Sequence, residues 1–182
     1  MWQQILNKIE TVSYQTSVPE GFVSPYSFGA KGDGTTNDAD AFNEAFNRGH
    51  NVYVPAGTYR IDSATPITMP NNSILLMDNN ATLKMDDASN SGAVIALQDV
   101  SNILIKGGNI VGERLSMPYF SESARAIYIG KSVKNVSIDN CNISGFKGDG
   151  IVLYTDLLTY RLDDEKMNNC PIYKVNQWQE TD

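Results

Sequence analysis

Short apolar segments, each bounded by polar residues or glycine, follow one another from residue 51 onward. They cover residues 51–54, 58–61, 74–77, 81–85, 93–97, 103–105, 109–111, 126–129, 136–138, 142–144 and 150–154. Segments of this length and character are typical of β-strands. The gaps between them are too short for crossover helices. The pattern therefore predicts a mainly β protein, built either as an antiparallel sandwich or as a solenoid of short strands.

An internal repeat decides between these two architectures. Residues 102–112 align with residues 135–145 at one constant offset, with Asn, an apolar residue, Ile, Asn, Ile and Gly coinciding. Residues 73–76, with Asn80 further on, form a weaker earlier copy. The alignment predicts that Asn80, Asn109 and Asn142 occupy one place in three successive units. A repeat of this kind favours the solenoid.

Stacked parallel coils give the repeat a physical reason. Equivalent residues of successive coils lie above one another, about 4.8 Å apart, so that inward Ile, Val and Leu form continuous columns. At a sharp turn between strands one residue must adopt the left-handed conformation, which Asn tolerates, and its amide can bond to the Asn of the next coil. A β-solenoid therefore explains the pattern better than a chance similarity among Asn-rich loops.

Helical spacing of apolar residues appears upstream of the strands. The first stripe consists of Trp2, Ile5, Leu6, Ile9 and Val12. It predicts a helix that either packs on its own domain or serves as a docking or trimerising helix, because a stripe alone does not choose its partner. Residues 1–23 are thus expected to be a helix and linker for attachment or trimerisation.

A second helix is predicted over residues 38–48, after three glycines in residues 29–34 that allow tight turns. Asn37 or Asp38 can cap its start, and Gly49 lies where it should stop. Its apolar face consists of Ala39, Phe42, Ala45 and Phe46.

Residues 157–182 leave the repeat and are predicted to form an off-pattern C-terminal cap or tail. An open solenoid end exposes strand edges and apolar core, so something must cover it. The cover could come from the apolar residues of this segment, from a partner chain, or from the rest of a longer chain.

Composition and charge narrow the classes of partner. The chain has 182 residues, 41% hydrophobic and 19% charged, which is typical of a globular domain. Its formal net charge is -7, and no cluster of Lys and Arg in the linear sequence offsets it, so neither nucleic acid nor a membrane surface is expected as a partner. An acidic polysaccharide would also require a local basic patch. Cys141 and Cys170 have the spacing of neither a zinc site nor a disulfide framework, and no metal or cofactor is expected.

Targeting signals are not apparent in the sequence. No apolar run is long enough to span a bilayer. The first residues lack the basic start and the apolar stretch of a secretory signal, which disfavours a secreted protein.

Two segments carry a specific family resemblance. Residues 24–38, followed by Ala41-Phe42, resemble the opening signature of the pectate-lyase superfamily of β-helix proteins. Residues 51–59 look like its next segment, and the similarity covers roughly residues 24–155. The resemblance implies a right-handed single-stranded parallel β-helix over residues 24–156. We expect it to be short, about three to four coils, with the helix at 38–48 capping its N-terminal end.

The resemblance also implies a class of function. The family includes secreted pectin-degrading enzymes, glycan epimerases and many phage tail spikes. We therefore expect a bacteriophage tail spike or tail fibre component, located in the virion. The expected partners are a host surface polysaccharide, two further copies in a homotrimer, and other tail or baseplate proteins bound through the N-terminal helix. The alternative is a polysaccharide lyase or glycoside hydrolase (a capsule depolymerase), or a secreted extracellular protein.

Catalysis in this setting would need paired carboxylates, or a base and a cation. The strongest candidate is Asp149, between Gly148 and Gly150, at a turn that enters a strand and resembles an Asp-Gly of related glycan hydrolases. Asp139 and Asp156 are its possible partners. A turn-forming role for Asp149 is the competing interpretation. Because so few coils fit into the chain, we do not expect it to be active by itself.

Overall fold

The computed structural model describes residues 17–86, 91–113, 123–154 and 172–175. Within these residues the strands form three parallel sheets, here called A, B and C. Sheet A contains β2 (Asn51–Val54), β5 (Ser73–Met77), β8 (Ser101–Lys106), β11 (Lys134–Asp139) and β14 (Ile172–Val175). Sheet B contains β1 (Asp33–Asn37), β3 (Gly57–Asp62), β6 (Ala81–Asp86), β9 (Asn109–Val111) and β12 (Asn142–Ser144). Sheet C contains β4 (Ile67–Thr68), β7 (Ser91–Leu97), β10 (Ser123–Ile129) and β13 (Ile151–Leu153).

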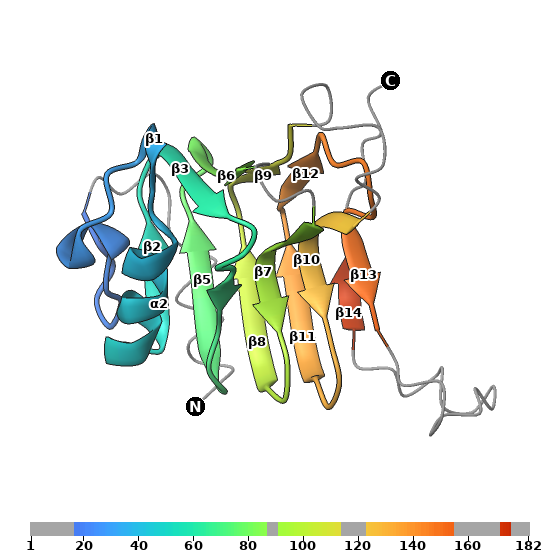
Figure 1. The fold of residues 1–182 in the computed structure, drawn as a ribbon. Coiled ribbons are helices and arrows are strands. Elements are labelled where there is room, and N and C mark those ends of the chain that lie inside the picture. Colours follow the sequence, from blue (N-terminus) through green and yellow to red (C-terminus); the bar gives the residue numbers. More distant parts are fainter. Residues whose placement is uncertain (1–16, 87–90, 114–122, 155–171, 176–182) are drawn as a thin grey trace.

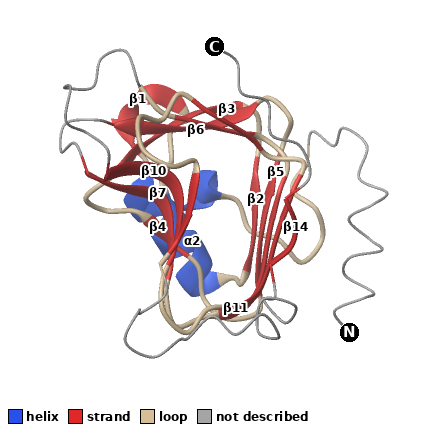
Figure 2. Ribbon diagram, turned by 90° about the vertical axis from the view of Figure 1, so that its right-hand side faces the viewer, coloured by secondary structure: helices blue, strands red, loops and turns tan. Residues whose placement is uncertain are grey.

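The chain visits the three sheets in the order A, B, C and then begins again one level further along the axis (Figure 1). All the strand pairs are parallel, and Figure 2, viewed along the axis, shows the sheets as three sides around one interior. The described part holds four complete three-strand coils, and β14 pairs with β11 as the start of a fifth. The predicted parallel β-helix is confirmed.

Most of the strand positions follow the sequence pattern, and three do not. Each apolar segment named above coincides with a strand to within a few residues. By contrast, β1 lies where the glycines predicted only turns, and β4 is too short to show a pattern. The third, β14, lies in residues 157–182, which the pattern predicted to leave the repeat.

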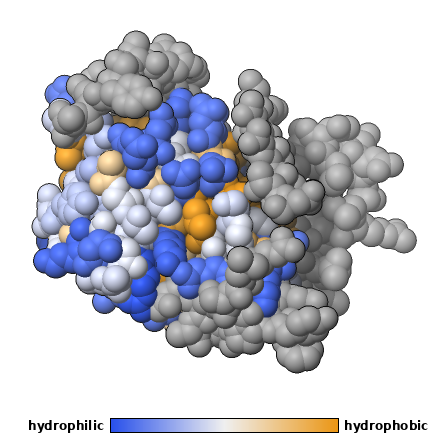
Figure 3. Space-filling view, turned by 90° about the horizontal axis from the view of Figure 1, so that it is seen from above, coloured by the Kyte–Doolittle hydropathy of each residue, from blue (hydrophilic) through white to orange (hydrophobic). Residues whose placement is uncertain are grey.

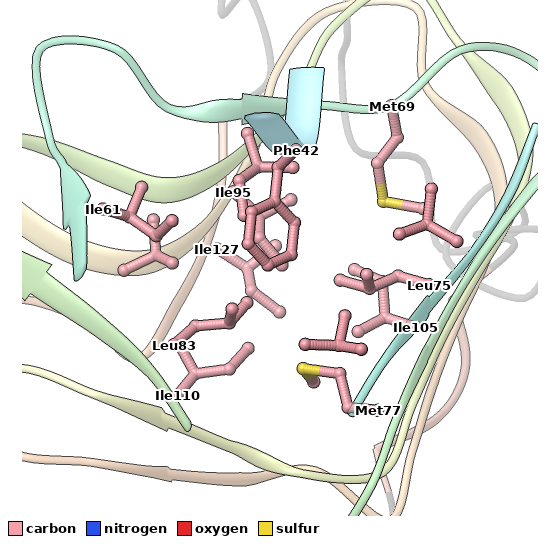
Figure 4. Close-up of a cluster of buried hydrophobic side chains, with 14 of the residues drawn as sticks. Phe42, Ile61, Met69, Leu75, Met77, Leu83, Ile95, Ile105, Ile110 and Ile127 are labelled. Carbon is pink, nitrogen blue, oxygen red and sulfur yellow. The ribbon is translucent and has the colours of Figure 1, made fainter. Parts of the chain in front are cut away.

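Continuous columns of apolar side chains fill the interior, as the repeat predicted (Figure 4). In sheet C one column consists entirely of isoleucine: Ile67, Ile95, Ile127 and Ile151. In sheet B the corresponding column is Tyr59, Leu83, Ile110 and Ile143. Burying a side chain of this size contributes roughly 1.5–3 kcal/mol. These columns are therefore the main source of stability along the axis.

An asparagine ladder runs along the corner where the chain enters sheet A. Asn72, Asn102 and Asn135 all have left-handed backbones, with φ of 58°, 60° and 54°. The Nδ2 of Asn102 donates to Oδ1 of Asn72 at 2.7 Å, and the Nδ2 of Asn135 donates to Oδ1 of Asn102 at 2.9 Å. These are the side-chain bonds and the conformation that the sequence predicted for a coil corner.

The prediction placed this ladder on other residues and was wrong in that respect. Asn109 and Asn142, the first residues of β9 and β12, do not have the left-handed backbone. Their side chains do bond, from Nδ2 of Asn142 to Oδ1 of Asn109 at 3.2 Å. Asn80 is not their equivalent, because Thr82 pairs with Asn109 in register.

Helix α2 (Ala39–Arg48) covers the N-terminal end of the solenoid (Figure 1). Phe42 and Phe46 are buried against the first coil, and Phe42 meets the Tyr59 ring edge-on at 5.4 Å between centroids. A short 3₁₀ helix, η1 (Pro25–Phe28), precedes β1. The predicted helix and its end at Gly49 are confirmed.

Asn37 and Asp38, the two candidate caps of α2, have different roles. The Oδ1 of Asn37 accepts from the backbone N–H of Ala39 at 3.2 Å, so Asn37 provides the side-chain cap. The carboxylate of Asp38 instead accepts from the backbone N–H groups of Lys31 at 2.7 Å and Gly32 at 3.0 Å. Asp38 thus holds the turn before β1 against the start of the helix.

Candidate functional site

The outer face of sheet B carries polar side chains in two rows along the axis. Because strand residues alternate in direction, the neighbours of the buried Tyr59, Leu83 and Ile110 point outward. The first row is Thr58, Thr82, Asn109 and Asn142, and the second is Arg60, Lys84, Val111 and Ser144. Figure 3 looks onto this side of the molecule, where hydrophilic residues predominate over the N-terminal part.

Two cations lie side by side in the second row. Arg60 and Lys84 are directly opposite each other on β3 and β6. The Nη1 of Arg60 donates to the carbonyl oxygen of Thr35 at 2.8 Å, and the ammonium of Lys84 forms an ion pair with Glu113. The side chains of Lys84 and Glu113 remain 37% and 32% exposed, so solvent and ligands can reach the pair. The fold therefore creates a local basic pair that is not visible in the linear sequence.

This face has the chemistry of a binding surface. Hydroxyl, amide and cationic groups repeat at the strand spacing of about 4.8 Å, and each can donate to oxygen acceptors. Acid/base cleavage of a glycosidic bond needs two carboxyl groups facing the same bond. Of the carboxylates near the cations, Glu113 is engaged by Lys84, and Asp62, two residues after Arg60 on the same face of β3, accepts from the N–H of Ala64 at 2.9 Å. The arrangement supports recognition of an extended polar polymer more directly than its cleavage.

Asp139, a predicted catalytic residue, lies at the end of β11 in sheet A. Its carboxylate forms an ion pair with Lys106 at 3.1 Å, across the β8–β11 pair. Both side chains are mostly shielded, at 22% exposure for Lys106 and 30% for Asp139. The structure thus shows a cross-strand ion pair at this position.

Asp149 is exposed, in the loop between β12 and β13. The carbonyl oxygen of Gly150 accepts from the N–H groups of Ala126 and Ile127 at 3.1 and 3.0 Å, which fixes the turn against β10. Asp139 precedes β12 and Asp149 follows it, and in the described part of the chain no hydrogen bond or ion pair joins the two. Asp156 lies outside the described residues. The catalytic role of these three residues stays a prediction.

An aromatic pair on sheet C was missed by the sequence reasoning. The rings of Tyr128 and Tyr154 lie 6.3 Å apart between centroids, and Tyr154 is 54% exposed. Tyr128 stands between the inward residues Ile127 and Ile129, and this alternation was the available signal that its ring faces outward. Exposed aromatic rings provide flat surfaces for a ligand.

Cysteine and metal chemistry adds little at these surfaces. Burial, with a smaller contribution from the charge of Asp139, raises the pKa of the Cys141 thiol to about 12. Cys170 lies outside the described residues. Among the side chains that the structure describes, no three His, Cys, Asp or Glu residues gather into a metal-binding group. No helix in the described ranges is long and apolar enough to cross a membrane.

Comparison with known proteins identifies a family and several relatives. The family model for rhamnogalacturonase A/epimerase, pectate-lyase-like, matches residues 22–155. An uncharacterized Bacillus subtilis protein, YclG, is 31% identical over 157 residues, covering 74% of this chain and 27% of that protein. The preneck appendage protein of Bacillus phage PZA is 25% identical over 213 residues, covering 85% of this chain and 24% of that protein. The chain therefore spans about a quarter of the length of these relatives.

A solved structure supports the same fold. The A-module of the mannuronan C-5 epimerase AlgE6 from Azotobacter vinelandii matches with a TM-score of 0.57 and 22% identity, over 69% of this chain and 39% of that one. At this identity the similarity establishes the β-helix fold and not the activity.

Proposed function

Since the chain belongs to the rhamnogalacturonase A/epimerase-type family of pectate-lyase-like proteins, we propose that it is part of a bacteriophage tail spike or tail fibre that attaches to a host surface polysaccharide. The similarity to a phage preneck appendage protein supports a place in the virion. The observation that carries polysaccharide binding is the pair of polar rows on the outer face of sheet B. The proposal includes a homotrimer and other tail or baseplate proteins as partners.

The polar rows suit a polysaccharide because the rows and a sugar chain both repeat along their length. Each of the four coils presents a hydroxyl or amide group in the first row, and all but the coil with Val111 add a polar group in the second. Arg60 and Lys84 add charge-assisted donors at the N-terminal part of the face. A sugar chain lying along the axis would meet these donors in succession.

Glycan binding by the purified full-length chain tests this proposal. We would measure binding to an array of bacterial capsular polysaccharides and lipopolysaccharides, for the native chain and for Arg60→Ala with Lys84→Ala. Losing two charge-assisted hydrogen bonds should weaken binding by roughly a hundredfold. Arg48→Ala is a matched control, because Arg48 is exposed on α2 and pairs only with Glu44 among the contacts described.

Three results bear on the proposal. Equal binding by the native chain and the double variant, with unchanged thermal unfolding, would remove sheet B from the binding surface. Failure of the native chain to bind any glycan on the array would count against attachment itself. Light scattering after size-exclusion chromatography would show whether the chain is a trimer.

A polysaccharide lyase or hydrolase is the second candidate function. It is favoured by the exposure of Asp149 in the loop after β12. Release of reducing ends or unsaturated sugars from a bound glycan, abolished by Asp149→Asn, would support this activity. Unchanged turnover in that variant would exclude Asp149 from the catalytic site.

A further inference from the structure

A second hydrophobic cluster lies outside the core, on the outer face of sheet A. It consists of Tyr53, Ile74, Leu76 and Leu104. Their strand neighbours point into the solenoid, so these four side chains point away from it. Even so, their exposure is only 0–6%, as low as that of the core. This outer cluster is thus buried although it faces outward.

The outer cluster is compact and has a clear border. Tyr53 lies opposite Leu76, and Ile74 lies opposite Leu104. Toward the C-terminal end the same two rows continue with Ser137 and with the ion pair of Lys106 and Asp139. Among the described side chains on the outer face of β2, β5, β8 and β11, the apolar ones are thus confined to this part. An apolar patch of this kind on an outer face marks a site of interaction.

The path of the chain brings its N-terminal region to the outer cluster. Val23 bridges Val52 in parallel, with Val23 N–H donating to Asn51 at 2.9 Å, and its side chain packs on the core. Phe22 points the other way and packs against the outer cluster. Among the described residues outside sheet A, Phe22 is the one that packs there. The residues before it therefore start on the outer side of sheet A.

We propose that residues 2–13 form an amphipathic helix that packs its apolar stripe on the outer cluster of the same chain. Twelve helical residues are about 18 Å long. From the level of Phe22 to β8 the cluster spans three strand spacings, about 14 Å, so the two lengths agree. The short connection to Phe22 makes the local concentration of the helix high, which favours its own chain over a second copy.

This inference is independent of the proposed function, and it chooses between the two roles that the sequence left open for the stripe. A helix that covers sheet A stabilises its own domain. A trimerising helix would leave the outer cluster to be covered by something else. Exposing the stripe or the outer cluster to water would cost free energy, because both are apolar.

Tryptophan fluorescence of the full-length chain tests the packing. The chain has two tryptophans, and Trp178→Phe leaves Trp2, within the stripe, as the only reporter. We expect blue-shifted emission and strong protection from acrylamide, both unchanged on dilution. Ile9→Asp in the same background should shift the emission to the red and remove the protection. Asn7→Asp, on the opposite side of the helix, is the matched control and should change neither.

A second measurement follows the exposure of sheet A, so that the test does not depend on tryptophan fluorescence alone. Ile9→Asp leaves the solenoid sequence intact, so its far-ultraviolet circular dichroism should be unchanged while binding of a hydrophobic dye rises. Exposed Trp2 in the Trp178→Phe chain with Ile9 intact would overturn the proposal. Protection that disappears on dilution would also overturn it, because the occupant would then be a second copy.

Discussion

At the residue scale, the corner before sheet A depends on one side chain with two partners. Asn102 donates to Asn72 and accepts from Asn135, and its own backbone is left-handed. Asparagine is one of few residues that tolerate this conformation and can also bond to an identical residue above and below. The ladder thus combines a backbone requirement with a side-chain interaction at the same position.

Two substitutions at Asn102 separate these contributions. Asn102→Ala loses both ladder bonds and places a Cβ-bearing apolar residue at positive φ, so it should lower the free energy of unfolding by about 2–3 kcal/mol. Asn102→Gly loses the same bonds without the steric cost, so it should lower the free energy of unfolding by only about 1 kcal/mol. Urea unfolding of both variants measures the difference. Equal losses would mean that the left-handed backbone imposes no strain here.

The thiol of Cys141 provides a pH-dependent prediction. Its pKa is raised from 9.0 to about 12 by burial in the folded chain, so the thiol remains protonated where an unfolded thiol would ionise. In a Cys170→Ser background, alkylation at pH 9 should be much slower for the folded chain than for the chain in denaturant. Folding holds this proton more tightly, so the contribution of Cys141 to stability is present below pH 9 and declines as the pH rises above it. Equal alkylation rates would contradict the raised pKa.

Residue types allow the columns to be predicted better than the corners. Isoleucines that recur at one place in each repeat form an inward column, so the repeat located Ile110 and Ile143 correctly. The left-handed position depends on how the turn is formed. Each repeat contains two asparagines, and by residue type alone either could occupy that position. Arg60 and Lys84 could not be paired from the sequence, because no visible repeat sets the length of that coil.

At the element scale, α2 closes the end of the solenoid that the first coil would leave open. Phe42 and Phe46 cover the interior, while Asn37 and Asp38 position the start of the helix. A single sequence cue, two polar residues before an apolar stripe, therefore corresponds to two separate contacts. The sequence predicted the helix, but it could not show that Asn37 caps the helix while Asp38 holds the turn before β1.

Alanine substitutions distinguish the two contacts. Asn37→Ala removes a partly buried cap bond and an exposed bond to the N–H of Asp62, and should cost about 1 kcal/mol. Asp38 is buried, at 1% exposure, and Asp38→Ala leaves the N–H groups of Lys31 and Gly32 without their acceptor, which should cost about 3 kcal/mol. Thermal unfolding of the two variants tests the order. A larger loss for Asn37→Ala would show that capping dominates.

Burial on both faces of a strand also leaves a signal in the sequence. In β5, all five residues of the run SILLM are buried. A half-exposed strand alternates, so an uninterrupted apolar run indicates a strand that is covered on both sides. From the sequence, this run predicted a strand but not its burial on both faces. The outer cluster on sheet A was therefore predictable, whereas its occupant was not.

At the scale of the whole molecule, the solenoid is a linear array in which each coil hydrogen-bonds to the coils before and after it. Stability in such an array is the sum of local and nearest-neighbour contributions. The two ends of the described stack differ, because α2 covers the first coil, whereas Ile143 and Ile151 in β12 and β13 are only half-buried. In the third coil, the corresponding Ile110 and Ile127 are fully buried. Protection should therefore fall along the axis.

Amide hydrogen exchange tests whether the coils of the full-length chain open separately. Amides of β12 and β13 should exchange more than about tenfold faster than those of β3 and β6, equivalent to roughly 1.4 kcal/mol in opening free energy. Ile127→Ala removes one member of the isoleucine column at a cost of about 2–5 kcal/mol, and Ile127→Val is the milder control. Because coupling acts between neighbouring coils, Ile127→Ala should accelerate exchange in β10 and β13 far more than in β3. Equal acceleration in β3, β10 and β13 would show that the stack unfolds as one cooperative unit.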